Sequence, residues 1–163
     1  MHIVLKKKKL YFGHYKIKCA IGKRGISRNK REGDCCTPVG EFTFESLFFR
    51  KDRIKNLKIH IPKKIIKKNM GWCDDPGSKK YNRLIKFPFS EKAEKLFLKK
   101  KSYDLLLVIS YNRRPIVPHK GSAIFLHIAN KKFSPTKGCV AIKKKDFLKI
   151  LPMIRKKTKI IIN

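Results

Sequence analysis

Short apolar runs, separated by charged or glycine-containing segments, recur along the whole chain and predict a mainly β domain. The runs are rich in β-branched, leucine and aromatic residues, which favour strands over helices. The expected strands cover residues 2–6, 10–21, 42–50, 103–111, 123–129, 139–142 and 157–162.

Two other segments have the spacing of amphipathic helices. In residues 90–101, Ser90 is a candidate N-cap residue, and Leu96 belongs to an apolar face with a helical repeat. Residues 143–151 carry a similar face, and Pro152 is expected to end that helix. The pattern therefore predicts long loops, many strands and only two short helices.

The strand expected at 123–129 leads into the segment with the clearest candidate chemistry. His127 lies twelve residues ahead of Cys139, which ends a Thr-Lys-Gly-Cys sequence. A thiol becomes a strong nucleophile when a base removes its proton, and imidazole is the side chain best suited to that task near neutral pH. Gly138 allows a close turn, so that main-chain N–H groups can face the oxygen of an attacked carbonyl. Residue types alone favour an ordinary buried thiol and a core histidine.

Strand alternation adds a geometric expectation to this pair. Residues 125, 127 and 129 should share one face of the strand, and residues 124, 126 and 128 should share the other. The first face carries the imidazole, whereas the second carries only isoleucine and leucine.

The spacing from His127 to the sequence at 136–139 resembles the signature of the L,D-transpeptidase catalytic domain of the YkuD type. Residues 37–42, Thr-Pro-Val-Gly-Glu-Phe, are similar to a second motif of that family. GWCDDP at 71–76 and YNR at 81–83 resemble a bacterial subgroup that consists of little more than this domain. The resemblance covers most of the chain and implies a β-sandwich with short helices and long loops.

The same resemblance implies a reaction. Cys139 would attack the carbonyl of a peptidoglycan stem tetrapeptide and release its terminal D-alanine, with His127 as the base and N–H groups around Gly138 and Cys139 holding the oxyanion. A diamino acid side chain of another stem would then accept the acyl group in a 3-3 cross-link. Water as acceptor would give an L,D-carboxypeptidase instead. The sequence also leaves a protein lysine or a free D-amino acid open as acceptor, and no cofactor is expected.

Two positions depart from the common family pattern. Lys137 stands where many members have a second histidine, and Ala141 stands where arginine or asparagine is usual. We expect the substrate contacts at these two positions to differ from those of typical members.

Two polar segments, 70–83 and 112–122, are candidate walls of a substrate cleft because they are interrupted by proline and glycine. Trp72 could line that cleft, and His119 is expected at its edge or in solvent. The Asp-Asp-Pro-Gly sequence fits a stabilised turn as well as a substrate contact. The candidate substrate-binding residues are Trp72, Asp74, Tyr81, Arg83, His119, Ser122, Thr136 and Lys137.

The charge of the chain suggests a polyanionic partner. Lysine and arginine together number 43 against 11 aspartate and glutamate, a formal net charge of +32. An anionic cell-wall polymer is a possible partner, and a non-catalytic basic binding protein is the rival function. Nucleic acid is not expected, because no nucleic-acid motif is present and only nine of the 43 basic residues are arginine. A lysine-rich composition from an A/T-biased genome is the plainer explanation.

Length, cysteines and the first residues complete the expectations. The 163 residues suit a single domain, 1–163, and a monomer. The five cysteines show no metal-ligand spacing, so no metal site is predicted. No apolar run is long enough for a transmembrane segment. Residues 1–10 place charge after a short apolar run, unlike a signal peptide, while the resemblance implies the periplasm or cell envelope. A cytoplasmic location stays open.

Overall fold

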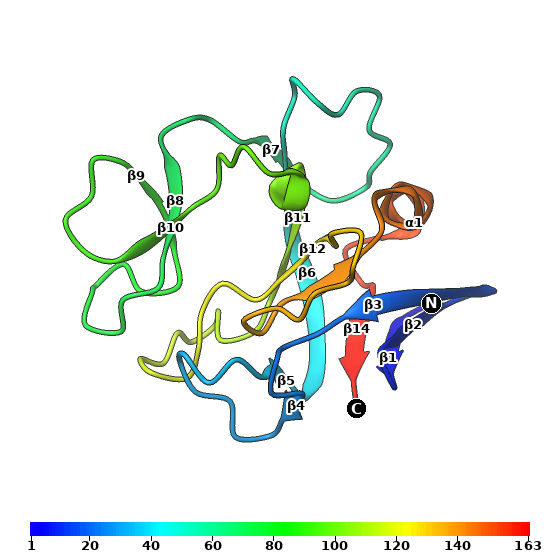
Figure 1. Ribbon diagram of the computed structural model, residues 1–163, viewed down its shortest axis with the longest axis horizontal. Coiled ribbons are helices and arrows are strands. Elements are labelled where there is room, and N and C mark those ends of the chain that lie inside the picture. Colours follow the sequence, from blue (N-terminus) through cyan, green and yellow to red (C-terminus); the bar gives the residue numbers. More distant parts are fainter.

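Nine strands form one sheet in the computed structural model, which describes residues 1–163. Their order is β11-β12-β13-β3-β2-β1-β14-β6-β7, and β6 also pairs with β11, so that the sheet closes on itself (Figure 1). The strands are β1 (Ile3–Lys6), β2 (Lys9–Phe12), β3 (Tyr15–Ala20), β6 (Gly40–Phe49), β7 (Lys63–Ile65), β11 (Leu105–Ile109), β12 (Phe125–Ile128), β13 (Val140–Ile142) and β14 (Lys159–Ile162).

The long strand β6 closes the sheet because its two ends pair with different partners. Residues 40–43 run antiparallel to β14, whereas residues 44–49 run antiparallel to β11, with a register shift between Leu107 and Ile109. Strand β6 thereby links β14 to β11, the first strand of the order, and the sheet closes around one interior. This arrangement agrees with the expected mainly β, sandwich-like fold.

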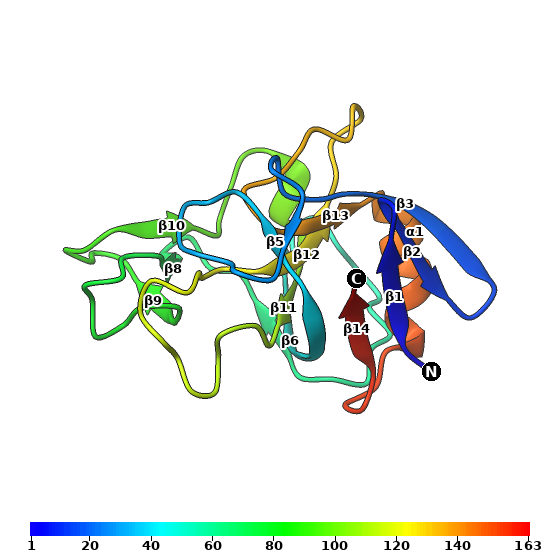
Figure 2. The ribbon, with the colours of Figure 1, turned by 90° about the horizontal axis from the view of Figure 1, so that it is seen from below.

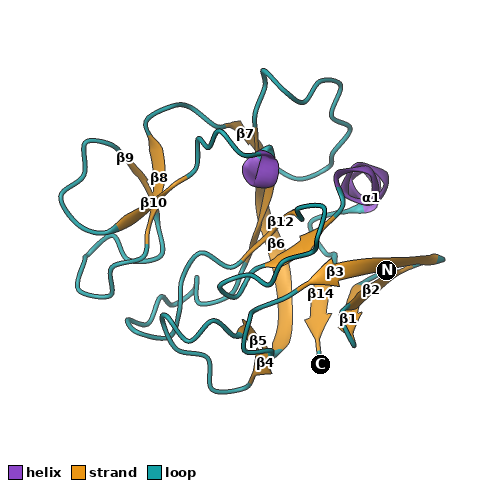
Figure 3. Cartoon of the chain, viewed as in Figure 1, coloured by secondary structure: helices purple, strands orange, loops and turns teal.

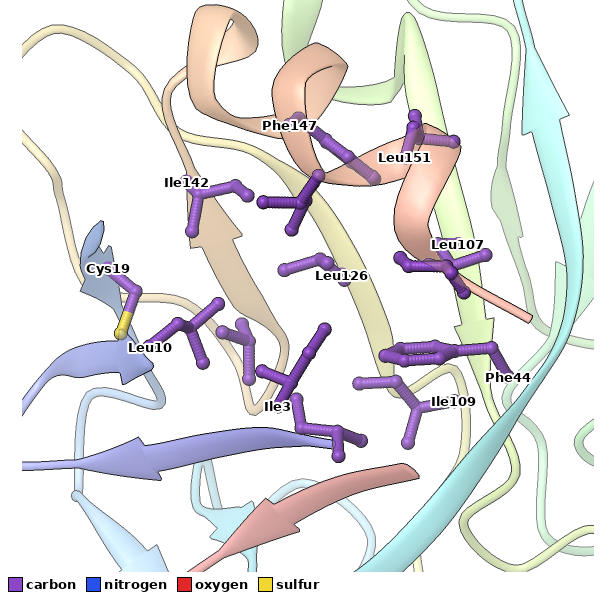
Figure 4. Close-up of a cluster of buried hydrophobic side chains, with 14 of the residues drawn as sticks. Ile3, Leu10, Cys19, Phe44, Leu107, Ile109, Leu126, Ile142, Phe147 and Leu151 are labelled. Carbon is purple, nitrogen blue, oxygen red and sulfur yellow. The ribbon is translucent and has the colours of Figure 1, made fainter. Parts of the chain in front are cut away.

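The interior of the closed sheet is filled by 25 buried apolar residues, which we call the inner core. Helix α1 (Lys144–Ile150) and the 3-10 helix η2 (Leu151–Met153) contribute to it. Figure 4 shows Phe147 and Leu151 pointing from these helices toward Ile142, Leu126 and Leu107. The amphipathic pattern of 143–151 thus buries its apolar face as predicted, and Pro152 lies in η2, directly after α1.

A second cluster of ten buried residues, which we call the outer cluster, lies on the opposite face of β11 and β12. It joins this face to a three-stranded sheet of order β10-β8-β9, built from β8 (Met70–Cys73), β9 (Leu84–Lys86) and β10 (Ala93–Lys95). Figure 1 and Figure 2 both show this small sheet to one side of β11 and β12. All five residues of β11 are buried, because the inner core covers one face and the outer cluster the other.

Long loops connect these elements, as Figure 3 shows. One of them contains the two-stranded parallel sheet of β4 (Ile26–Ser27) and β5 (Thr37–Pro38). None of the helices is long and apolar enough to cross a membrane.

The prediction of a helix at 90–101 is wrong. Residues 93–95 form strand β10, which pairs with β8, and only the 3-10 helix η1 (Lys101–Tyr103) follows. Pairing with β8 satisfies the backbone there, and Leu96 inserts fully into the outer cluster, so tertiary contacts override helical spacing. The strand expected at 10–21 is instead a hairpin of β2 and β3, because Gly13 turns the chain with a φ of 58°.

Candidate active site

The two candidate catalytic side chains come from the neighbouring parallel strands β12 and β13. Leu126 pairs with Val140 and His127 with Ala141, so Cys139 lies across from Phe125 at the entrance to β13. Because side chains alternate, the thiol and the imidazole project from the same face. The predicted alternation is confirmed: Leu126 belongs to the inner core, whereas Phe125 and Cys139 belong to the outer cluster.

Two main-chain groups hold the Cys139 thiol. Its Sγ donates to the carbonyl oxygen of Ala123 at 3.1 Å and accepts from the N–H of Phe125 at 3.4 Å. Cys139 is 8% exposed, and this burial raises the pKa of the thiol to about 12. The sulfur is therefore a protonated thiol at neutral pH, fixed at the start of β12.

The imidazole of His127 is held in one tautomer. Nδ1 lies 3.1 Å from the carbonyl oxygen of Ile128, which can only accept, so Nδ1 carries the proton. Burial lowers the pKa of His127 to about 4, and the ring is neutral at neutral pH. Its Nε2 therefore has a free lone pair that can accept a proton. The site combines a neutral thiol with a neutral base.

The turn before Cys139 requires glycine at position 138. Gly138 has a φ of 137°, and a Cβ placed there would lie 2.8 Å from the carbonyl oxygen of Cys36. Fully buried Thr37 holds the same turn, since its Oγ1 donates to the carbonyl oxygen of Gly138 at 2.8 Å and accepts from the N–H of Gly22 at 2.9 Å. The Thr-Pro sequence at 37–38 thus supports the turn that carries the thiol.

Thr136 determines which N–H groups of this turn are available. Its Oγ1 donates to the carbonyl oxygen of Cys139 at 2.6 Å and accepts from the N–H of Gly138 at 3.1 Å. The N–H of Gly138 is therefore engaged, whereas the N–H of Cys139 donates to no protein acceptor. When the thiol attacks a carbonyl, the N–H of Cys139 could stabilise the oxyanion that forms on the carbonyl oxygen. Lys137, between Thr136 and Gly138, is exposed.

A family comparison agrees with this geometry. Residues 2–162 match the family model described as YkuD, L,D-transpeptidase catalytic domain. The chain belongs to the YkuD family. Searches of curated proteins and of solved structures each found no match. Membership makes the domain a cysteine L,D-transpeptidase with activity of that type on peptidoglycan, a substrate that the family meets outside the cytoplasm.

Three of the substrate-binding candidates are buried parts of the YkuD scaffold. Trp72 is 2% exposed, and its Nε1 donates to Oδ1 of Asn82 at 2.9 Å. Tyr81 and Ser122 both donate to Oε2 of Glu32, at 2.5 and 2.7 Å. Their polar atoms are used internally, so Trp72 packs in the outer cluster instead of lining a cleft, and the other two join separate loops.

The remaining candidates lie nearer to solvent. Arg83 and His119 are exposed, and the main chain of His119 accepts from the N–H of Glu32 at 2.8 Å. Asp74 is partly buried; its Oδ2 lies 3.5 Å from Nζ of Lys92, and its Oδ1 is buried without a hydrogen-bond partner. No hydrogen bond joins Arg83, His119 or Asp74 to the thiol or the imidazole.

Two residues near the YkuD site were missed by sequence reasoning. Tyr103 packs edge-on against the ring of His127, with centroids 5.4 Å apart, and its hydroxyl donates to Oε1 of Glu94 at 2.6 Å. Residue 94 was assigned to a helix, whose periodicity could not place its side chain opposite Trp72 on β8. The pairing of β10 with β8 brings the carboxylate to the site.

Proposed function

We propose that this domain makes 3-3 cross-links, using Cys139 as nucleophile and His127 as the base. The donor is a stem tetrapeptide of peptidoglycan, and the acceptor is the side-chain amine of a diamino acid in another stem. The observation that carries the proposal is the shared outer face of the thiol and the imidazole, beside a backbone N–H with no protein acceptor. Family membership supplies the reaction type.

Acylation begins with the neutral pair. A thiol with a pKa of about 12 and an imidazole with a pKa of about 4 keep the proton on sulfur until a carbonyl is in place. Sγ then attacks the carbonyl carbon while Nε2 of His127 takes the proton. The N–H of Cys139 donates to the developing oxyanion. The resting enzyme therefore exposes no thiolate to unrelated electrophiles.

Breakdown of the adduct releases D-alanine. The carbon–nitrogen bond breaks, and the imidazolium of His127 returns its proton to the leaving amine, which leaves a thioester on Cys139. An acceptor amine attacks this thioester and loses a proton to Nε2. The carbon–sulfur bond then breaks, and that proton returns to the sulfur. The exchange of one amide for another balances without a cofactor.

Mass spectrometry of the intact protein tests this proposal. The purified chain is mixed with a disaccharide tetrapeptide, with and without an amine-bearing acceptor stem, and released D-alanine is measured in parallel. We expect an acyl adduct and D-alanine with the native chain and neither with a Cys139→Ala control. Cross-linked product identifies a transpeptidase, whereas tripeptide alone identifies the L,D-carboxypeptidase. Well-folded native protein without any adduct would falsify the proposal.

The β2–β3 hairpin favours a second function, attachment to an anionic cell-wall polymer. On its exposed face Lys9 lies opposite Lys18, and Tyr11 lies opposite Lys16. Like charges directly across a strand pair repel each other, and none of these lysines has an acidic partner. A polyanion would relieve that repulsion. As the rival function, such binding would be unaffected by Cys139→Ala.

A further inference from the structure

The imidazole of His127 lacks the usual third partner of a catalytic histidine. Its one hydrogen bond joins Nδ1 to the carbonyl oxygen of the next residue, Ile128. No aspartate, glutamate, asparagine or glutamine contacts the ring through a hydrogen bond. A catalytic base must be held within a small angular range, so another group has to restrict the ring.

Tyr103 occupies the position from which such a restriction can be applied. Its ring meets the ring of His127 at 78°, and it meets Phe125 at 90° with centroids 6.2 Å apart. Edge contacts of this kind prefer a defined orientation of both rings. Tyr103 is 7% exposed at the end of η1, directly ahead of β11, so its own ring is fixed by packing. It therefore covers two residues of the same face of β12.

Glu94 holds the far end of Tyr103. Its Oε1 accepts from the tyrosine hydroxyl at 2.6 Å, and its backbone lies in β10, opposite Trp72 of β8. The Trp72 ring in turn packs edge-on against Phe125 at 5.2 Å. The hydrogen bond therefore ties the small sheet to the strand that carries the base. Burial raises the pKa of Tyr103 well above its usual value, so Tyr103 acts as a neutral donor and not as a base.

We propose that Tyr103, held by Glu94, positions the imidazole of His127 for proton exchange with Cys139. This inference rests on the proposed function for its reaction, but the contacts concern the base alone. Tyr103 touches no reacting atom in this scheme and is a positioning residue. Its ring sets the tilt of the imidazole, and its hydroxyl sets the distance between the small sheet and β12.

The charge of Glu94 adds a separate effect on the thiol. No lysine or arginine forms an ion pair with this carboxylate, although the chain carries 43 of them. Burial chiefly raises the pKa of Cys139, and the negative charge of Glu94 raises it further. Replacement of Glu94 by glutamine keeps an acceptor for Tyr103 but removes the charge. The two effects of Glu94 can therefore be measured apart.

The first experiment compares three variants in acyl-adduct formation and in alkylation of Cys139 by iodoacetamide. We expect Tyr103→Leu, which removes the ring contact, to slow both reactions on the order of 100-fold, and Tyr103→Phe, which keeps the ring, to slow them on the order of 10-fold. Tyr111→Phe removes a hydroxyl bonded to the carbonyl oxygen of Lys120 and should leave both rates unchanged. Glu94→Gln should keep the acylation rate within a few-fold and speed alkylation, because the thiol loses a neighbouring negative charge.

A spectroscopic readout separates positioning from general damage. In long-range ¹H–¹⁵N spectra, the native His127 should show a single neutral tautomer with the proton on Nδ1, and Tyr103→Leu should mix the tautomers while the protein stays folded. A single unchanged tautomer together with native rates in Tyr103→Leu overturns the inference. Alkylation and tautomer need no peptidoglycan, so a native chain that fails to react with tetrapeptide, yet shows these variant effects, refutes the proposed function alone.

Discussion

Cys19 and Cys139 are both buried thiols beside β13, yet we propose only Cys139 as a nucleophile. Cys19 pairs with Ile142 across β3 and β13 and points into the inner core, as Figure 4 shows. Cys139 directly precedes the same strand, β13, and belongs to the outer cluster. Burial raises the pKa of each thiol to about 12. Burial and thiol pKa therefore do not distinguish the proposed nucleophile from a core residue.

The difference lies in the groups that surround each sulfur. Cys139 has a main-chain donor and acceptor at its sulfur, an unpaired N–H of its own and His127 on the same face. Cys19 has aliphatic neighbours, and its own N–H donates to the carbonyl oxygen of Lys8 at 3.0 Å. The proposed nucleophile therefore differs from the core thiol in its neighbouring candidate base and candidate oxyanion donor, not in a lowered pKa.

The largest expected effect comes from exchanging the two cysteines for alanine in turn. Cys139→Ala should abolish acyl transfer, a loss on the order of 10⁴-fold or more, with little change in the free energy of unfolding. Cys19→Ala should do the reverse, lowering the free energy of unfolding by about 1–2 kcal/mol through a small core cavity while acyl transfer continues. Denaturant unfolding and D-alanine release measure both. Equal loss of activity in the two variants would remove the distinction between the thiols.

Gly138→Ala should disturb the turn that presents Cys139. The added Cβ meets the carbonyl oxygen of Cys36 at 2.8 Å in a backbone with a φ of 137°. We expect a loss of roughly 100-fold in acylation, because the thiol and its N–H shift, together with about 3 kcal/mol of unfolding free energy. Gly33→Ala is the matched control, since Gly33 also has a positive φ, of 77°, but nothing lies within 4 Å of its Cβ. Gly33→Ala should lower the free energy of unfolding by about 1 kcal/mol and leave the acylation rate unchanged.

The sequence could predict the parts of the fold that local periodicity determines. Alternation at 123–129 correctly separated the two faces of β12, and the spacing at 143–151 gave α1, because the inner core covers both. The prediction of a helix over residues 90–101 failed because β10 forms only by pairing with β8, which no local pattern encodes. The prediction that Trp72 lines a cleft failed for a related reason, since its burial between the two sheets depends on tertiary packing.

The candidate site divides in the same way. The pair His127 and Cys139 could be found because both belong to one local segment, whose spacing resembles the family signature. Contacts over long sequence distances could not, such as Thr37 with Gly138 and Tyr103 with Glu94 across two sheets. Their residue types are common, and only the closed sheet brings them to the thiol.

Thr37→Val tests one of these long-range contacts with a smaller expected effect. Valine has nearly the same shape but cannot donate to the carbonyl oxygen of Gly138 or accept from the N–H of Gly22. Two buried groups lose their partner, so we expect a loss of about 2–4 kcal/mol in unfolding free energy and roughly 10-fold in acylation. Thr37→Ser keeps the hydroxyl and should stay within about 1.5 kcal/mol of the native chain. A serine variant as slow as the valine variant would contradict a role for the hydrogen bonds.

The pH dependence should show whether Cys139 reacts with the help of His127. With the pKa of His127 lowered to about 4, its imidazole stays neutral from pH 7 down to pH 5, and acylation of Cys139 should hold over that range. A histidine with an ordinary pKa of about 6.5 would lose roughly 30-fold. Alkylation of Cys139 in a His127→Gln variant should instead rise about tenfold per pH unit, as expected for a thiol whose pKa is about 12 and that lacks a base.

The lowered pKa of His127 also makes the free energy of unfolding depend on pH. The folded pKa of His127 lies below its unfolded value, so between about pH 4 and 6.5 the unfolded chain binds the extra proton. The stabilisation that comes from burying a neutral His127 ring is complete above about pH 6.5 and is lost as the pH falls to about 4. The unfolding free energy of the native chain should therefore drop more between pH 7 and pH 5 than that of His127→Gln. Parallel pH curves for the two proteins would contradict this account.

The smallest effect concerns the charged surface on the side of Cys19. Lys9→Gln, Lys16→Gln and Lys18→Gln together remove three exposed lysines of the β2–β3 hairpin, two of which lie opposite each other. Because these charges are close together and unpaired, the triple variant should co-sediment with an anionic wall polymer several-fold less than a variant with Lys51, Lys55 and Lys58 changed to glutamine, which loses the same net charge elsewhere. Acyl transfer to a small soluble acceptor should be native in both. Equal loss of binding in the two triple variants would assign the attraction to net charge alone. The β2–β3 hairpin would then have no special role in binding the polymer.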